Sequence, residues 1–510
     1  MVIDIENERK SLESRLQVLT RSQCELLILD YSEINENFAA WLDTRLTVAH
    51  AQTGESLDPE LFLHSIETLF FRRPVHNRRR NHTVVDVDET VLDELIDAVD
   101  LFLGFGRGQD ALAILRPTTD ALAEHWPECA DHDETLHEYF PKLDALIAQA
   151  VLMADVPHGL REDLVDDLDN WQNHVAEYGA DMAFTTAIEA CMRGWDDPGL
   201  EDVLSGRVRS WGPTEQGDSS ERDLTQARLA ALAGSGRHDE YLNLSRALGF
   251  YCEHATMLAE LGRMGDAVNV AQKQLSRHNE IRRVAESIAA AGESDTALEL
   301  ADWGLSLPVK DDSDPWRPRS ADLVLLAQWL RDTAYELGQQ DLAVKAAQTA
   351  FEQSFSRQDF REASKISDPE AWPALRETLI SNLLRAPYAM DRIKILLDED
   401  RIDDAVSCVD PTTTQSSVYA TDLQSLAERA YVKHPDWTIA LAFRMAKPIM
   451  DEGRSKYYQI ATNWLAIAAH AYRASGRATE WQTEINALIH LHSRKYSLRP
   501  LLQALKRATN

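Results

Sequence analysis

The chain has 510 residues, of which 44% are hydrophobic, and its 84 acidic residues against 52 lysines and arginines give a formal net charge of −32. This composition argues against a disordered chain, and no stretch approaches the roughly 20 apolar residues that a membrane span needs. A chain this acidic repels a phosphate backbone overall and attracts basic partners, although high charge also serves solubility alone.

The N-terminal residues 1–18 are charged and lack the apolar stretch of a signal peptide, and we expect them to fray. Five cysteines stand far apart, at positions 24, 129, 191, 252 and 408, and no CxxC pair occurs. This pattern is typical of small core residues in a reducing compartment. We therefore expect a cytoplasmic protein whose cysteines fill core positions.

The segment RRPVHNRRR, residues 72–80, is the one strongly basic stretch of the chain. Its arginines can contact the phosphates of nucleic acid or an acidic protein segment. The competing interpretation is that they pair within the protein with the acids that follow, from Asp86 to Asp97. Aromatic residues interleaved as stacking platforms for bases are missing. The candidate contact residues are Arg72, Arg73, Arg78, Arg79 and Arg80.

Two segments after the basic stretch carry patterns that are typical of a strand and of a nucleotide-binding loop. Strand-like alternation is best at residues 83–87, TVVDV, a short stretch before a helical pattern. The glycines at 104, 106 and 108 resemble a fragment of a dinucleotide-binding loop, but they follow a helical stripe and not a strand. We interpret them as a turn between two helices.

Two groups of histidine and cysteine invite comparison with metal sites. Positions 125, 129, 132 and 137 hold three histidines and one cysteine, and the first three would share a face of a continuous helix. Pro127 and the acids after it instead indicate an inter-helix turn with exposed histidines. Cys252 and His254, two residues apart on a helix, predict a core cysteine and a surface histidine. We expect no metal and no cofactor.

Helical spacing of apolar residues dominates, as at positions 281–289 and 323–337. A short phrase recurs among these stripes: a glycine, often an arginine, and then an acid, an alanine and an aliphatic residue. Clear copies start at 106, 262, 292, 338 and 400, the last with aspartate in place of glycine, and looser copies start at 236 and 476.

Each copy of the phrase predicts a turn between two antiparallel helices. Its first residue takes the left-handed conformation that ends a helix. The acid can cap the next helix and suits its positive end. The alanine five positions after the start lets two helices approach closely. The phrase therefore predicts an all-α protein, an irregular α-solenoid of antiparallel helix hairpins of the tetratricopeptide-like kind.

Composition marks few boundaries. Residues 206–220, with Trp-Gly-Pro at 211–213, are the best break. They predict an N-terminal helical half at 19–205, a linker at 206–220 and a C-terminal helical-repeat half at 221–510. Loops are expected at 311–318 and 410–417. Basic residues at 490–499 precede Leu501, Leu502 and Leu505, which we interpret as a final capping helix.

Five segments share a family likeness. They are LTRSQCELLILDYSEINENFAAWLDTRL at 19–46, AAAGESDTAL at 289–298, LRDTAYELGQQDLAVKAAQTAFEQS at 330–354, WPALRE at 372–377 and LHSRKYSLRPLLQAL at 491–505. Together they resemble the helical C-terminal region of bacterial and archaeal SWIM zinc-finger proteins. The resemblance implies a helical-repeat fold and an interaction role. A SWIM finger binds zinc through CxC and a distant CxH; because this chain has no CxC, zinc and finger-mediated DNA binding do not carry over.

Motifs of the common enzyme classes are missing: no GxSxG, no Walker loop and no HExxH occurs. The sequence predicts a non-enzymatic scaffold that binds a basic protein or peptide partner, with no membrane association. The alternative is a nucleic-acid-associated protein that uses the Arg72–Arg80 segment. An enzyme whose site is assembled from distant residues is a third hypothesis.

Overall fold

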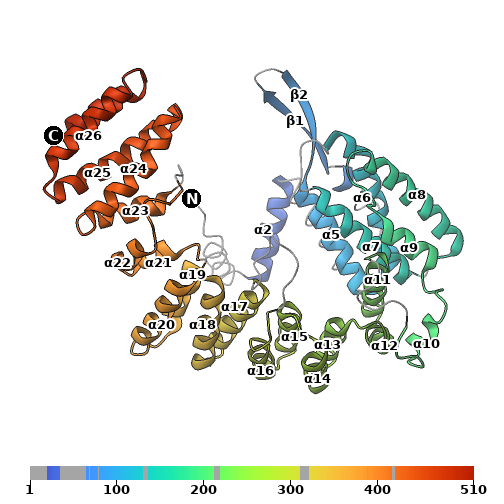
Figure 1. Cartoon of the computed structure of the whole chain (residues 1–510). Helices are drawn as coiled ribbons and strands as arrows, with labels where there is room; N and C mark the ends of the chain where they lie inside the picture. Colours follow the sequence, from blue (N-terminus) through green and yellow to red (C-terminus); the bar gives the residue numbers. More distant parts are fainter. Residues whose placement is uncertain are drawn as a thin grey trace. The chain divides into compact units, whose positions relative to one another are not determined.

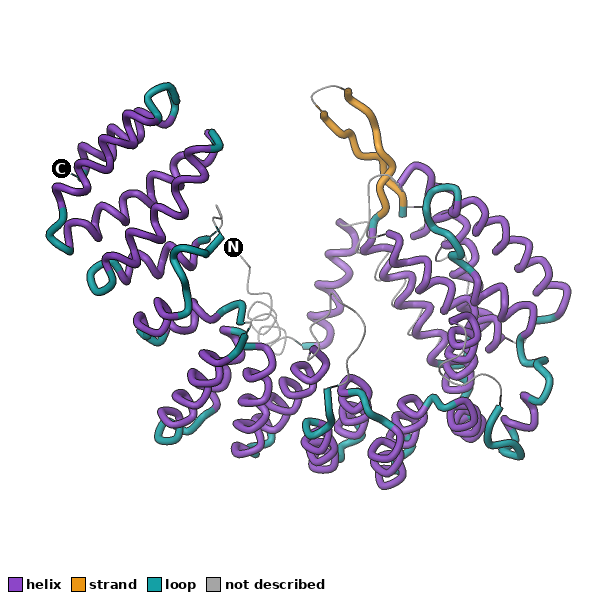
Figure 2. Tube along the Cα trace, viewed as in Figure 1, coloured by secondary structure: helices purple, strands orange, loops and turns teal. Residues whose placement is uncertain are grey.

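A computed structural model describes residues 20–34, 62, 65–67, 69–77, 80–129, 136–154, 156–211, 219–309, 321–387, 389–415 and 420–509. Over these residues the chain forms helices and one two-stranded hairpin (Figure 1, Figure 2). The all-α class predicted from the apolar spacing is confirmed, with the hairpin as a local exception.

Two compact units divide the chain, Met1–Leu258 and Ala259–Asn510. The division falls further along the chain than the linker expected at 206–220, of which residues 212–218 lie outside the described residues. The expected fraying segment 1–18 and the expected loop 311–318 also lie outside them.

The first unit contains helix α2 (Arg21–Ile34), the hairpin and a group of packed helices. Strands β1 (Phe70–Asn77) and β2 (Arg80–Val87) pair antiparallel, from Phe70↔Val87 to Asn77↔Arg80. The strand candidate at 83–87 is therefore the base of a longer strand. The helices that follow are α5 (Glu89–Gly104), α6 (Gly108–Cys129), α7 (Tyr139–Ala154), α8 (His158–Ala176), α9 (Thr185–Arg193), α10 (Leu200–Leu204), α11 (Ser219–Gly234), α12 (His238–Leu248) and α13 (Tyr251–Glu260), with a 3-10 turn at Leu136–Glu138.

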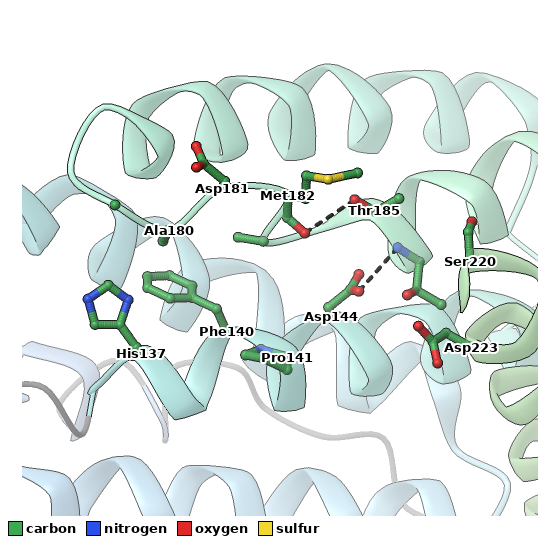
Figure 3. Close-up of a pocket in the computed structure, with 13 residues that line it drawn as sticks. His137, Phe140, Pro141, Asp144, Ala180, Asp181, Met182, Thr185, Ser220 and Asp223 are labelled. Carbon is green, nitrogen blue, oxygen red and sulfur yellow. Dashed lines mark hydrogen bonds between the residues drawn. The ribbon is translucent and has the colours of Figure 1, made fainter. Parts of the chain in front are cut away.

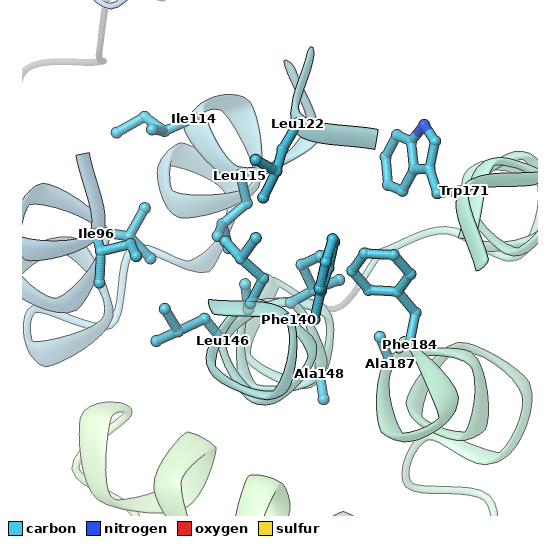
Figure 4. Packing of buried hydrophobic residues seen from close by; sticks show 14 of the residues in the cluster. Ile96, Ile114, Leu115, Leu122, Phe140, Leu146, Ala148, Trp171, Phe184 and Ala187 are labelled. Carbon is cyan, nitrogen blue, oxygen red and sulfur yellow. The ribbon is translucent and has the colours of Figure 1, made fainter. Parts of the chain in front are cut away.

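Helix α7 is the centre of the first unit, because it contacts α5, α6, α9 and α11. Its apolar residues recur three or four positions apart, and Leu143, Ile147 and Val151 are buried. The ring of Phe140 meets those of Trp126 and Phe184 edge-on, with centroids 4.8 and 5.9 Å apart. Edge-on aromatic pairs add to the stability gained from burial. Figure 4 shows Phe140 and Phe184 together in this core.

Helix α6 runs to Cys129 although it contains Pro117 and Pro127. The expected interruption at Pro127 is therefore wrong. Proline in a helix interior costs about 3 kcal/mol. Here it adjoins Trp126, which is fully buried, and lies in the last turn before the buried Cys129. Packing of these side chains holds the turn helical.

The second unit is an irregular α-solenoid of helix hairpins, as the repeated phrase predicts. Helix α15 packs against both α16 and α17, α18 packs against α19 and α20, and α23 packs against α24 and α25. The unit's helices are α14 (Met264–Gln274), α15 (His278–Ala290), α16 (Ser294–Gly304), α17 (Ala321–Glu336), α18 (Gln340–Ser354), α19 (Arg357–Ile366), α20 (Trp372–Arg385), α21 (Arg392–Asp398), α22 (Ile402–Ser407), α23 (Thr421–Ala430), α24 (Pro435–Asp451), α25 (Tyr458–Ala474), α26 (Ala478–Leu491) and α27 (Leu498–Ala508), with a 3-10 turn at Ser455–Tyr457.

The turns predicted from the repeated phrase are confirmed. The first residue of every copy has a left-handed backbone, and even Asp400 has φ of 55°. Left-handed residues end helices by satisfying their last carbonyls. The small residues predicted to allow close helix approach are fully buried at all five clear copies: Ala111, Ala267, Ala297, Ala343 and Ala405.

The side-chain cap predicted for the acid of the phrase is wrong, whereas its predicted place near the positive helix end is confirmed. The residue just before the second helix makes no side-chain cap, for example Arg263 and Arg401. That arginine instead pairs with the acid three residues later, as in Arg263–Asp266 at 2.8 Å. The acid lies within the first helical turn, where its charge still suits the positive helix end. The same pairing occurs at Arg107–Asp110, Arg237–Glu240, Arg401–Asp404 and Arg477–Glu480.

A buried carboxylate joins three helices of the second unit. Asp359 of α19 is 1% exposed. It accepts hydrogen bonds from Gln328 Nε2 at 2.9 Å and Arg331 Nη1 at 3.1 Å, both on α17. Ser354 Oγ at the end of α18 and Ser356 Oγ also donate to it, at 2.6 and 2.8 Å. Burial of a charge is tolerated only with such complete pairing.

Two smaller predictions have different outcomes. The final capping helix is confirmed, because α27 buries Leu502 and Leu505 against α25 and α26. The stripe at 323–337 is buried in α17 except for its last member, Leu337, which is 47% exposed. Leu337 directly precedes the left-handed Gly338, so it lies past the end of the helix and off its buried face.

Candidate functional site

The basic segment predicted from the sequence forms most of a β-hairpin. Residues 72–77 belong to β1 and Arg80 opens β2, while Arg78 and Arg79 lie outside the described residues. The base of the hairpin is anchored by apolar packing. Val85 and Val87 are buried, and the Phe70 ring lies 4.3 Å from that of His125 on α6. In Figure 1 the hairpin projects away from the neighbouring helices.

The strand register places an uncharged residue opposite each described arginine. Arg72 pairs with Val85, Arg73 with Val84 and Arg80 with Asn77. The acid nearest the tip along β2 is Asp86, and its cross-strand partner is Phe71. The interpretation that these arginines pair with the acids from Asp86 to Asp97 stays a prediction, because the arginine side chains lie outside the described part of the structure.

An acidic pocket of about 430 Å³ lies where α7, α9 and α11 meet. Figure 3 shows Asp144 beside the start of α9, with Phe140 and His137 to one side and Asp223 to the other. Asp181 also lines the pocket, and no lysine or arginine is among its described lining residues.

Asp144 caps α9 from another helix. It is 8% exposed, and it accepts the backbone N–H groups of Thr186 at 3.1 Å and Ala187 at 2.7 Å. The residue that precedes α9, Phe184, has no side chain able to cap it. Burial raises the pKa of the Asp144 carboxyl to about 6, although these hydrogen bonds favour its charged form.

The other end of α9 is held by a buried guanidinium. Arg228 of α11 is 1% exposed and donates through Nε and Nη2 to the carbonyl of Gly194, at 3.0 and 2.7 Å. Its Nη2 also contacts Asp197 Oδ2 at 2.7 Å. A cation suits the negative end of a helix. Burial lowers the pKa of Arg228.

The capping contacts of Asp144 explain why a buried carboxyl lies in this pocket, with no need of a catalytic role. A carboxylic acid with a pKa near neutrality can serve as a general acid or base. Both Asp144 oxygens, however, accept amides that α9 needs satisfied. We therefore assign Asp144 to positioning α9. Sequence reasoning missed it, and its signal was a single acid among Leu143, Leu146 and Ile147.

The histidine and cysteine groups have separate outcomes. Cys252 is buried as predicted, but His254 is also buried, and its Nδ1 lies 3.0 Å from Ser245 Oγ of α12. The expected surface histidine is therefore wrong, because the His254 side chain is buried and contacts Ser245 of α12. Over the described residues no group of three His, Cys, Asp or Glu side chains is placed to hold a metal ion. Residues 130–135, which include His132, lie outside that description.

Burial also determines the place and the reactivity of the cysteines. Five free thiols are present, and Cys129, Cys191 and Cys252 are buried, as expected for core residues. Burial raises the pKa of Cys191 to about 12, which keeps it an unreactive thiol.

Among the described helices, none is both long and apolar enough to cross a bilayer.

No family model matches the chain, and no curated protein matches it. Among solved structures, the chain is similar to a circular tandem repeat protein with novel repeat topology and enhanced subunit contact surfaces, at 16% identity over 92% of this chain and 98% of that one. The TM-score is 0.18, so this likeness carries no argument about fold or function.

Proposed function

We propose that the chain is a non-enzymatic scaffold that binds a basic protein or peptide partner. The observation that carries the proposal is the run of helix hairpins in residues 259–510, each packed against the next. In such stacks every repeat contacts only its neighbours, which leaves a long surface of equivalent positions for a partner. The resemblance to the helical region of SWIM zinc-finger proteins supports the same interaction role.

Ion pairs between successive hairpins of the second unit support a scaffold whose binding surface has a fixed shape. Lys345 of α18 pairs with Asp302 of α16 at 2.5 Å, and Arg357 of α19 pairs with Asp398 of α21 at 2.7 Å. Each exposed pair stabilises the fold by only about 0–1 kcal/mol. They join helices of successive hairpins at defined positions along the stack.

The net charge of −32 supports a basic partner. Exposed carboxylates lie at the hairpin turns of the second unit, where Asp400 and Asp436 are 85% and 87% exposed, although each also pairs with an arginine, Arg429 and Arg477. Complementary charge steers a partner toward its site and raises the rate of association. The five free cysteines support a reducing, cytoplasmic setting for this encounter.

Capture from a native host lysate on the immobilised full chain, with and without nuclease, tests the proposal. We expect a basic protein that survives nuclease, elutes with salt and is absent from a tag-only column. Recovery of the same proteins on both columns would contradict the scaffold function.

The alternative function is association with nucleic acid through residues 72–80. The hairpin supports it, because the register brings arginines of both strands into one element without acids opposite them. This function would use the first unit and leaves the scaffold role of the second unit unaffected.

A further inference from the structure

The last two helices of the second unit concentrate positive charge on an acidic protein. No aspartate or glutamate occurs from Ile485 to Asn510, although the chain holds 84 of them. The same stretch, drawn in red in Figure 1, contains five cations: Arg494, Lys495, Arg499, Lys506 and Arg507. The three arginines are exposed. This part of the molecule therefore attracts anions although the whole chain carries a charge of −32.

Hydrogen bonds to neighbouring helices fix the backbone that carries these charges. Lys495 Nζ donates to the carbonyls of Met450 and Asp451 at the end of α24, the second at 3.1 Å. Trp481 Nε1 donates to Thr509 Oγ1 at 2.9 Å, which holds the end of α27 against α26. A surface that is already held in place loses less entropy when a partner binds.

The fold makes little use of the other four cations. Within the described part of the chain, Arg494, Arg499 and Lys506 form no ion pair with a carboxylate. Arg507 Nε donates to the carbonyl of Gln503, one turn earlier in α27, at 3.4 Å. Lys506 and Arg507 suit the negative end of α27, but Arg499 lies in its first turn, where a cation is unfavourable. Neither ion pairing nor helix stability therefore explains Arg494 and Arg499.

Apolar side chains lie beside this charge. Tyr496 is 92% exposed in the turn between α26 and α27, and Leu491, the last residue of α26, is 69% exposed. Exposed tyrosine and arginine together are typical of protein interfaces. Positions 499, 506 and 507 lie on one side of α27, and about 12 Å separates the first from the last. We define the cap surface by these cations and apolar residues: Leu491, Arg494, Tyr496, Arg499, Lys506 and Arg507.

The size of the cap surface selects its occupant. Duplex DNA carries one charge per about 1.7 Å and continues beyond the cap surface, where it would meet acids such as Glu484 and Asp451, the latter 61% exposed. An anionic bilayer extends further still. One tyrosine is not the series of stacking platforms that binds a single strand. We propose that the cap surface docks a short acidic segment of a partner protein, whose carboxylates pair with the cations and whose apolar side chains pack on Leu491 and Tyr496.

Fluorescence anisotropy on the full chain tests this docking with three labelled peptides of about 12 residues, long enough to span the cap surface. The first alternates glutamate pairs with leucine or phenylalanine, the second holds glutamate alone, and the third replaces each glutamate of the first by lysine. At about 50 mM salt the first binds roughly 5- to 30-fold tighter than the second, because only the first fills the apolar part. No binding of the first peptide, or tighter binding of a duplex of about 20 base pairs or of phosphatidylserine vesicles, overturns the proposal.

Variants locate the binding on the cap surface. R494S/R499S/R507S weakens the first peptide roughly tenfold, whereas R494K/R499K/R507K keeps most of the affinity. L491S/Y496S removes the preference for the first peptide over the second and leaves the salt dependence. The matched control R209S/R222S/R277S removes three exposed arginines outside the cap surface and binds like the native chain. Each variant keeps the native melting temperature, because the changed side chains are exposed.

The outcomes separate this docking from the scaffold function of the hairpin stack. The lysine peptide reports on the stack, and its affinity is the same in the native chain and in every cap-surface variant. Unchanged binding of the first peptide to R494S/R499S/R507S, or an equal loss in the matched control, overturns the proposal. Sedimentation velocity that shows the native chain self-associating, and R494S/R499S/R507S remaining a monomer, also overturns it, because the occupant is then a second copy.

Discussion

Asp144 of α7 and Ala187 of α9, 43 residues apart in the chain, are joined by a hydrogen bond of 2.7 Å from the Ala187 amide to the Asp144 carboxyl. With Arg228 on the Gly194 carbonyl, both ends of α9 are satisfied by side chains of other helices. A nine-residue helix has little stability of its own, so its position depends on these contacts.

The pKa of about 6 predicts how Asp144 affects stability with pH. Because the folded-state pKa lies above the ordinary value of an aspartate, about 3.9, the folded protein holds the proton more tightly than the unfolded chain. This contribution is complete below the unfolded pKa and is lost as pH rises through about 6. Between pH 5 and 7 the native protein should lose about 1 kcal/mol relative to D144N. Urea denaturation of both proteins over that pH range measures the difference.

D144A supplies the control, since alanine can neither titrate nor cap. At pH 7 we expect it to be less stable than D144N by about 0.5–2 kcal/mol, the usual value of a helix cap. A stability difference between native protein and D144N that does not change with pH would contradict the assignment of Asp144.

Gly108, the first residue of α6, lies against the backbone of α7. A Cβ there would meet Ala150 O at 2.7 Å and Ala154 N at 2.8 Å. We expect G108A to lower the free energy of unfolding by about 1–3 kcal/mol, because the two helices must separate. The matched control is G265A in α14, where a Cβ meets nothing within 4 Å. That change should raise stability by about 0.5–1 kcal/mol. Equal effects in thermal unfolding would refute the close packing.

Arg331 contacts two carboxylates in different settings, the buried Asp359 and the exposed Asp332. D359A leaves the guanidinium and two serine hydroxyls without their shared acceptor. We expect a loss of about 3–5 kcal/mol, as for other broken buried pairs. D332A should cost less than about 1 kcal/mol, because Asp332 is 61% exposed. Chemical denaturation that ranks the two variants the other way would show that Asp359 does not hold the three helices together.

Asp400 stands where the other copies of the repeated phrase have glycine, and its φ is 55°. The left-handed conformation costs a residue with a Cβ about 1 kcal/mol. D400G should therefore be as stable as the native protein or up to about 1 kcal/mol more stable, after loss of the exposed pair with Arg429. The reciprocal change G338D should destabilise by about 1 kcal/mol. Melting temperatures that move in the opposite directions would contradict this account of the turns.

The sequence predicted the helical turns because their requirement is local. A left-handed residue, a buried alanine and apolar residues three or four positions apart are each visible within one hairpin, as at Gly262 and Ala267. These features led to the all-α class and to the solenoid of the second unit.

Tertiary contacts could not be read from the sequence in the same way. Asp144 caps α9, and His254 contacts Ser245 of α12. In neither case does the local sequence pattern identify the partner. The strand β1 was missed because arginines and a proline hide its alternation, and only pairing with residues 80–87 makes it a strand. Of the candidate site, the sequence identified the arginines but not the hairpin that presents them.

Hydrogen exchange on the full chain, alone and with the partner captured after nuclease treatment, tests the scaffold function most directly. The scaffold proposal predicts slower exchange of amides within residues 259–510, spread over several hairpins, because the partner lies along the stack. Exchange that is unchanged there, or slowed only within residues 70–87, would contradict it.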